Sequence, residues 1–178
     1  KKSFAAEIVK KHTKFKKKIP IIFPMARKDF DPDGIWSIAV EKIVKTIKKG
    51  ESVVLLCLGD TSLFASSSNI LRIIKNNYPE IITNTIPGIS SLSAAAALND
   101  FDLVKKGETL IIKECPSSIS ELTSLIRDSR GNKTVLAIMK VGKRWNLVRE
   151  TLKKEDIINT SLIALNVGMP DQIIQYAS

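Results

Sequence analysis

The stretch VVLLCLGDTSLFASSS, residues 53–68, constrains the fold more than any other part of the chain. The apolar run at 52–58 is typical of a strand whose two faces are both covered in a parallel sheet. Gly59 and Asp60 end this run, and small hydroxyl residues lead into a helical pattern at 68–77. A strand that feeds a helix predicts one unit of an open α/β sheet, in which ligands bind beyond the carboxyl ends of the strands.

The same alternation extends along the chain. We predict further helices at residues 3–17, 36–49, 91–98, 117–126 and 144–153. We predict further strands at residues 19–23, 81–86, 109–113, 134–140, 161–167 and 173–176. The pattern indicates an open, mostly parallel α/β sheet in residues 1–114, followed by a smaller mixed α/β domain in residues 115–178, with the boundary near Cys115–Pro116.

Composition and charge narrow the function classes. The chain has 178 residues, 44% of them apolar, and a formal net charge of +10. The basic residues are dense only in KKHTKFKKK (10–18), where Phe15 is the sole aromatic residue, so a solvated surface is favoured over nucleic-acid contact. No apolar run approaches the ~20 residues of a membrane span, and the charged start does not fit a secretory signal. We therefore expect a cytoplasmic location, no membrane partner and no nucleic-acid partner.

Cysteine and histidine usage limits the chemistry further. The two cysteines, Cys57 and Cys115, do not make a disulfide framework. The single histidine, His12, lies in the basic stretch, far along the chain from both cysteines. We expect no metal site and no Ser-His-Asp triad.

Polar residues follow two successive predicted strands. Gly59 and Asp60 end one strand, and the sequence PGISS (87–91) ends the next. Glycine permits close approach of the backbone to a ligand, and the Asp60 carboxylate can accept hydrogen bonds from ribose hydroxyls or an ammonium group. The alternative is that Asp60 is only a turn residue and the serines at 66–68 are only helix caps. The chain has no Gly-x-Gly-x-x-Gly and no Gly-Lys-Ser loop, so dinucleotide or ATP sites of the usual kind lack support.

These residues carry a family resemblance. GDTSLFASSSNIL followed by TIPGISSLSAAAA resembles the tetrapyrrole (corrin/porphyrin) methylase family, in which Gly-Asp-Pro after one strand precedes Pro-Gly-[Ile/Val]-[Ser/Thr]-[Ser/Ala] after the next. FPMARKDFDPDGIW (23–36), AIMKVGKRWNLVRETL (137–152) and GMPDQII (168–174) resemble the branch that methylates a meso carbon of precorrin-2, giving precorrin-3A, in cobalamin synthesis. The resemblance implies a two-domain fold, S-adenosyl-L-methionine in the cleft between the domains, a small-molecule tetrapyrrole substrate and a homodimer.

The resemblance also implies roles for individual residues. The implied cofactor-binding residues are Gly59, Asp60, Thr61, Phe64, Ser66, Ser90, Ser91, Met139 and Ile163. The basic residues that flank the motifs are implied to bind the carboxylates of the substrate: Arg27, Lys28, Lys140, Lys143 and Arg144. We assign no catalytic residue, because the sequence does not identify a base.

The chain departs from the family pattern at several points. Thr61 stands in place of the family's proline, and Phe64-Ala65 in place of Tyr-Ser. The family's first strand, its Gly-x-Gly-Pro-Gly-Asp loop and its last strands have no counterpart, so we expect a sequence truncated at both ends. Four alternatives stay open: a methylase of the same family acting on cobalt-precorrin-2, a diphthine synthase, a non-catalytic basic α/β module that binds nucleic acid, and a catalytically inactive binding domain. The FPM…W and MPDQ stretches argue against a diphthine synthase.

Overall fold

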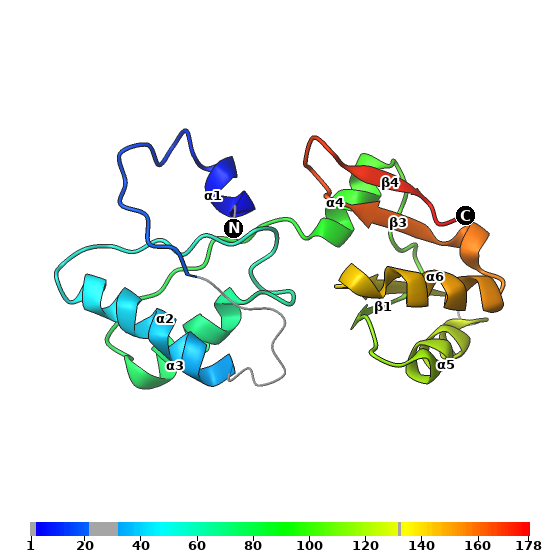
Figure 1. Cartoon of the computed structure of the whole chain (residues 1–178), viewed down its shortest axis with the longest axis horizontal. Helices are drawn as coiled ribbons and strands as arrows, with labels where there is room; N and C mark the ends of the chain where they lie inside the picture. Colours follow the sequence, from blue (N-terminus) through cyan, green and yellow to red (C-terminus); the bar gives the residue numbers. More distant parts are fainter. Residues whose placement is uncertain (1–2, 22–31, 132) are drawn as a thin grey trace. The chain divides into compact units, whose positions relative to one another are not determined.

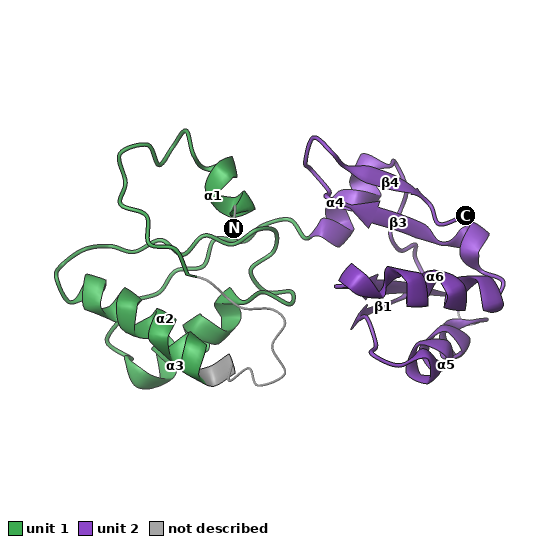
Figure 2. Cartoon of the chain, viewed as in Figure 1, with its two compact units in different colours: residues 1–90 green, residues 91–178 purple. Residues whose placement is uncertain are grey.

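The computed structural model describes residues 3–21, 32–131 and 133–178 (Figure 1). The chain divides into two compact units, Lys1–Ser90 and Ser91–Ser178 (Figure 2). This division lies upstream of the domain boundary that the sequence suggests near Cys115. The helix and loop that follow residue 90 belong to the second unit, and a functional boundary near residue 115 stays a prediction.

The first unit contains three helices in its described residues, α1 (Phe4–Ile8), α2 (Pro32–Ile47) and α3 (Ser67–Asn77). Ser3 caps α1, because its hydroxyl accepts a hydrogen bond from the backbone N–H of Ala6 at 3.3 Å. The prediction of one helix over residues 3–17 is wrong beyond α1. Apolar side chains at helical spacing end with Val9, and turns rich in lysine follow.

Helices α2 and α3 pack against each other, and their apolar side chains form the core of the first unit. Trp36, Val40 and Ile43 from α2 and Ile70 and Ile74 from α3 are all buried there. The predicted helices at 36–49 and 68–77 are confirmed within a few residues. Gly50 follows α2 with φ +82°, as expected where a helix stops.

The strands predicted at residues 52–58 and 81–86 are wrong as paired strands. Within the described part of the first unit, neither segment joins a β-ladder. In both segments, half-buried and exposed side chains nevertheless alternate along the chain. Val53 and Leu55 pack against the helical core, while Val54 is 80% exposed and Ile82 is 97% exposed. An apolar run predicts an extended backbone, but a ladder also needs a neighbouring segment at hydrogen-bonding distance. The strand predicted at 19–23 lies partly outside the described residues.

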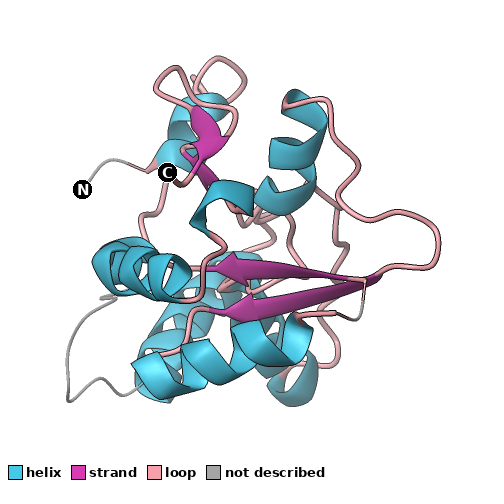
Figure 3. Ribbon diagram, turned by 90° about the vertical axis from the view of Figure 1, so that its right-hand side faces the viewer, coloured by secondary structure: helices cyan, strands magenta, loops and turns pink. Residues whose placement is uncertain are grey.

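The second unit is mixed α/β. Its elements in chain order are α4 (Ser91–Leu98), β1 (Thr109–Glu114), α5 (Ile119–Ser129), β2 (Thr134–Met139), the short helix η1 (Gly142–Arg144), α6 (Trp145–Lys154), the short helix η2 (Ile158–Thr160), β3 (Leu162–Leu165) and β4 (Ile173–Tyr176). The strands β1 and β2 are parallel and aligned along their whole length, with Glu114 opposite Met139 (Figure 3). The strands β3 and β4 form a separate antiparallel pair. The predicted strands and helices of this unit are confirmed to within a few residues.

The core of the second unit lies between α5 and α6. Leu122 and Ile126 of α5 pack with Val148 and Leu152 of α6. Ser118 caps α5 by accepting a hydrogen bond from the backbone N–H of Glu121 at 3.2 Å. Across the described residues, no helix combines the length and the apolar character that crossing a bilayer requires.

Candidate functional site

Two loops of the first unit meet at a pair of glycines. Gly59 has φ +80°, a left-handed conformation that side-chain-bearing residues rarely adopt. A Cβ atom placed on Gly88 would overlap the carbonyl oxygen of Gly59. A Cβ atom on Gly59 would lie 3.6 Å from the carbonyl oxygen of Ile89. The structure therefore confirms that GDT and PGIS converge, and glycine is required at 88 by the approach of the backbone.

Asp60 lies beside this junction and is held by Ser62. Both the backbone N–H and the hydroxyl of Ser62 donate to Oδ1 of Asp60, each at 2.7 Å. These two hydrogen bonds, the backbone one first, lower the pKa of Asp60, and the backbone N–H of Leu63 lowers it further against an opposing effect of burial. Asp60 is thus a carboxylate at neutral pH, held by local donors.

The loop from Thr61 to α3 contains further predicted site residues. The Ser68 hydroxyl donates to the carbonyl oxygen of Thr61 at 3.2 Å and ties the loop to the first turn of α3. Phe64 has φ +51° and is 40% exposed. Ser66 precedes α3 but its hydroxyl makes no capping hydrogen bond. The cofactor roles of Thr61, Phe64 and Ser66 stay predictions.

Ser67 adds a feature that the sequence did not single out. Its side chain is buried, and within the described residues its Oγ has no hydrogen-bond partner. A buried hydroxyl without a partner costs free energy unless a ligand or water satisfies it. Ser67 therefore marks the start of α3 as a place where a polar group can be accepted.

The serine pair after Pro-Gly is divided between the two units. Ser90 is half-buried at the end of the first unit, and Ser91 is exposed as the first residue of α4. We call the close approach of Gly59 and Gly88 the glycine junction. Ser90 lies near it in the chain, because it directly follows Ile89, whose carbonyl oxygen faces Gly59. The role of both serines in cofactor binding stays a prediction.

In the second unit, Met139 lies at the carboxyl end of β2. Its carbonyl oxygen accepts a hydrogen bond from the backbone N–H of Cys115 at 2.8 Å, which continues the β1–β2 pairing by one residue. Met139 is half-buried. Burial raises the pKa of the Cys115 thiol, while the nearby Arg144 charge acts in the opposite direction. Met139 thus lies where ligands bind in α/β sheets.

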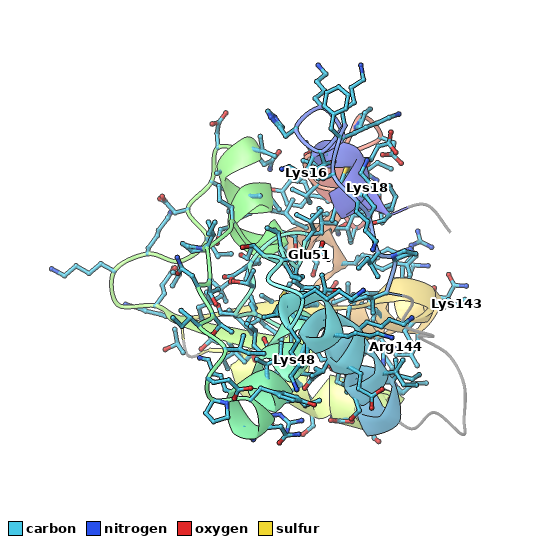
Figure 4. All side chains as sticks on the ribbon, turned by 90° about the vertical axis from the view of Figure 1, so that its left-hand side faces the viewer. Lys16, Lys18, Lys48, Glu51, Lys143 and Arg144 are labelled. Carbon is cyan, nitrogen blue, oxygen red and sulfur yellow. The ribbon has the colours of Figure 1, made fainter. Side chains whose placement is uncertain are left out.

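Basic residues gather just after Met139. Lys140 has φ +56°, and Nη2 of Arg144 donates to the Lys140 carbonyl oxygen at 2.9 Å. Lys143 and Arg144 lie in η1, immediately before α6 (Figure 4). The structure thus brings Lys140 and Arg144 into contact, and one nitrogen of Arg144 is engaged by the backbone. Arg27 and Lys28 lie outside the described residues.

Ile163 occupies a different environment. It is half-buried in β3 and packs against the apolar core of the second unit. This packing is sufficient to explain why an apolar residue stands at position 163, and no ligand is needed to explain it. Its predicted place in an adenine pocket stays a prediction.

The residues at the glycine junction fit S-adenosylmethionine by their chemistry. The junction offers backbone in close approach and a carboxylate for an ammonium or hydroxyl group. At the start of α3, the buried Ser67 hydroxyl has no partner among the described residues. The sequence prediction missed Ser62 and considered Ser67 and Ser68 only as possible helix caps. The Asp-x-Ser spacing, which is typical of a side-chain-to-backbone turn, is a signal that points to Ser62.

Comparison with known proteins gives a consistent result. The family profile of the Tetrapyrrole (Corrin/Porphyrin) Methylases matches residues 1–177. A probable cobalt-precorrin-2 C(20)-methyltransferase of Methanocaldococcus jannaschii is 32% identical over 130 residues, which are 71% of this chain and 54% of the relative. The cobalt-precorrin-2 C(20)-methyltransferase of Salmonella typhimurium is 22% identical over 150 residues, which are 84% of this chain and 60% of the relative. The chain thus spans little more than half the length of these relatives.

Solved structures support the fold. The X-ray structure of a cobalt precorrin-4 methyltransferase, CbiF, superposes with a TM-score of 0.63 at 16% identity, covering 80% of this chain and 61% of that one. The crystal structure of the methyltransferase CobJ gives a TM-score of 0.54 at 21% identity, covering 86% of this chain and 69% of that one. At these identities the likeness establishes the fold class, and it confirms the predicted methylase-like α/β architecture.

Proposed function

This chain belongs to the tetrapyrrole (corrin/porphyrin) methylases, and from that premise we propose that it serves S-adenosylmethionine-dependent methylation of a meso carbon, C20, of precorrin-2. The observation that carries the proposal is the meeting of the GDT and PGIS loops at Gly59 and Gly88. These two motifs are the ones that carry the family resemblance, and the structure of the first unit brings them together. The Methanocaldococcus jannaschii relative is named a probable cobalt-precorrin-2 C(20)-methyltransferase, which supports position C20 of a precorrin-2 macrocycle and keeps the cobalt-bearing form open.

The cofactor is proposed to bind at the glycine junction. Asp60 is ionised at neutral pH, and the hydrogen bonds from Ser62 lower its pKa further, so it can accept hydrogen bonds from the ammonium group or the ribose hydroxyls. The junction backbone and Ser90 are proposed to supply further polar contacts. The cofactor roles of Met139 and Ile163 stay predictions of the family resemblance. S-adenosylmethionine supplies an electrophilic methyl group on a sulfonium sulfur when it is bound.

The protein's main contribution to the reaction is positioning. The meso carbon of the tetrapyrrole is nucleophilic because the conjugated pyrrole nitrogens donate electron density to it. The C–S bond of the donor would break as the new C–C bond forms, and a base, to which we assign no residue, would take the proton that the meso carbon loses. Holding the two reactants in line contributes about 7–11 kcal/mol to lowering the barrier, so no covalent nucleophile on the protein is required.

The basic residues after Met139 are proposed to bind the substrate. Precorrin-2 carries many carboxylates, and Lys140, Lys143 and Arg144 place three positive charges at the carboxyl end of β2. Substituting Lys140 and Arg144 with Glu should raise KM for the tetrapyrrole and leave cofactor affinity unchanged. Lys75→Glu on α3 is the matched charge control. An equal fall in cofactor affinity would refute the substrate role.

We expect a homodimer, as the family resemblance implies. The sedimentation of the chain with and without S-adenosylmethionine tests this expectation, and a monomer at all concentrations would contradict it.

A two-step experiment tests the proposed function. S-adenosylmethionine is titrated into the chain by calorimetry, and precorrin-2 is then added, with cobalt in one arm and without it in the other. We expect saturable binding of the cofactor and a product heavier by one methyl group. The arm that gives product identifies the substrate form.

Each other outcome contradicts a stated part of the proposal. Cofactor binding without product in either arm indicates a catalytically inactive binding domain. The absence of cofactor binding, together with salt-sensitive binding of RNA, indicates that the basic stretch around Phe15 has the nucleic-acid role instead.

A further inference from the structure

One serine holds the carboxylate that the proposed function places at the cofactor. The backbone N–H and the hydroxyl of Ser62 both donate to the same carboxylate oxygen, Oδ1 of Asp60, at 2.7 Å each. A carboxylate rotates readily about its last side-chain bond, since that torsion has broad minima. Two donors on one oxygen restrict this rotation. An ionised carboxylate has about four lone-pair sites on its two oxygens, so Asp60 can still accept hydrogen bonds from other donors.

The same loop is anchored at its other end. The Ser68 hydroxyl donates to the carbonyl oxygen of Thr61 at 3.2 Å, and Ser68 belongs to the first turn of α3. Helix α3 is fixed in the core of the unit by Ile70, which is 1% exposed. The loop that carries Ser62 is therefore tied to a packed helix.

Thr61 leaves the backbone of this loop less restricted than a proline would. A proline ring would fix φ at this position, but threonine leaves φ free to vary. The hydrogen bonds of Ser62 and Ser68 restrict the segment in place of a ring. The glycine junction fixes the segment on its other side, because the Gly59 carbonyl lies against Gly88.

We propose that Ser62 is a positioning residue of the cofactor site, which orients the Asp60 carboxylate so that it accepts a hydrogen bond from an ammonium or hydroxyl group of the bound cofactor. This inference rests on the proposed function, because Asp60 is assigned to the cofactor there. Ser62 acts through Asp60 and need not touch the cofactor itself.

The electrostatics of the carboxylate agree with this role. Ser62 is the main reason that the pKa of Asp60 is lowered, and Leu63 is the other donor. Among the described residues, no charged side chain contributes to that shift. Because a lowered pKa keeps the carboxylate ionised to a more acidic pH, cofactor binding should persist below the ordinary pKa of aspartate.

The test is a calorimetric titration of S-adenosylmethionine into the full chain and three variants from neutral to acid pH. Ser62→Ala removes one donor, and we expect it to weaken binding about three- to tenfold at neutral pH. On acidification, this variant should also lose S-adenosylmethionine binding at a higher pH than the unmodified chain. Ser62→Thr keeps the hydroxyl and should behave like the unmodified chain. Ser124→Ala removes a longer hydrogen bond, at 3.4 Å, between a serine hydroxyl and Asp128 on α5, and should change neither property.

A direct measurement separates positioning from a loss of folding. The carboxyl carbon of Asp60 is followed by NMR through an acid titration without ligand, and Ser62→Ala should raise the pKa of Asp60. If Ser62→Ala binds S-adenosylmethionine as tightly as the unmodified chain and loses binding at the same acid pH, the inference is overturned while the proposed function stands. If the unmodified chain does not bind S-adenosylmethionine at all, the proposed function fails and the inference fails with it.

Discussion

The two units of the chain are held together in different ways. The second unit has aligned parallel and antiparallel strand pairs and a helix capped by Ser118. The first unit packs α2 against α3, but its long extended segments join no ladder in the described residues. Yet the best-defined candidate site lies in the first unit. Its loops are fixed by glycine contacts and serine hydrogen bonds, so precise local geometry does not require a surrounding sheet.

The largest effects should come from the two helical cores. Leu122 in the second unit is 0% exposed and Ile70 in the first is 1% exposed. Substituting either with Ala should lower the free energy of unfolding by about 2–5 kcal/mol, measured by urea denaturation. A much smaller loss for Ile70→Ala than for Leu122→Ala would show that the core of the first unit is packed less tightly than that of the second.

Gly88→Ala tests the glycine junction. The new Cβ would overlap the Gly59 carbonyl oxygen, so the two loops must separate. Overpacking of this kind costs about 1–3 kcal/mol, and we expect S-adenosylmethionine to bind about tenfold more weakly or worse.

The control for this variant is Gly107→Ala in the second unit. Gly107 has φ +84°, and among the described residues no atom lies within 4 Å of the position that a Cβ would take, so the substitution strains the backbone without a clash. It should leave cofactor affinity unchanged. Equal losses for both variants would mean that the junction has no particular part in binding.

A smaller effect should appear at the buried carboxylate of the second unit. Glu155 is 6% exposed and accepts two hydrogen bonds from Arg127, at 2.8 and 3.1 Å. These bonds lower the pKa of Glu155, so its contribution to stability is present above its ordinary pKa and is lost as the pH falls through the folded-state value. Glu155→Gln should lower Tm at neutral pH and reduce the further loss of Tm towards acid pH. Glu150→Gln, at an exposed pair with Lys153, is the control and should change Tm little.

The smallest effect is expected on the outer side of the extended segments. Ile82 is 97% exposed, so Ile82→Lys should change the free energy of unfolding by no more than about 0.5 kcal/mol. The adjacent Ile81 packs against the helical core, and Ile81→Lys should cost clearly more. Equal costs in denaturation would show that both sides of the segment are covered.

The contrast between the units also explains what the sequence could predict. Helix α5 follows from local signals, since Ser118 supplies the cap and Leu122 and Ile126 supply the apolar spacing. Strands β1 and β2 are predicted by apolar runs, and in the structure these two runs pair with each other. The apolar run at 52–58 has the same signal, but pairing is a non-local property that composition does not encode.

The candidate site was predictable in part for similar reasons. The glycines and Asp60 are visible as a motif, but among the described residues the close approach of Gly59 and Gly88 occurs without paired strands before them, so the sequence pattern does not specify it. The hydrogen bonds of Ser62 and Ser68 depend on side-chain conformations that the motif does not specify. Helical spacing likewise placed Arg144 at the start of a helix, but not its bond to the Lys140 carbonyl.

A titration of S-adenosylmethionine into isotopically labelled protein, followed by backbone amide NMR, tests the central claim most directly. The amide signals of Gly59, Asp60, Gly88 and Ser90 should shift together and give one shared Kd. Shifts confined to one of the two loops, or to residues away from both, would contradict a single methyl-donor site at the glycine junction.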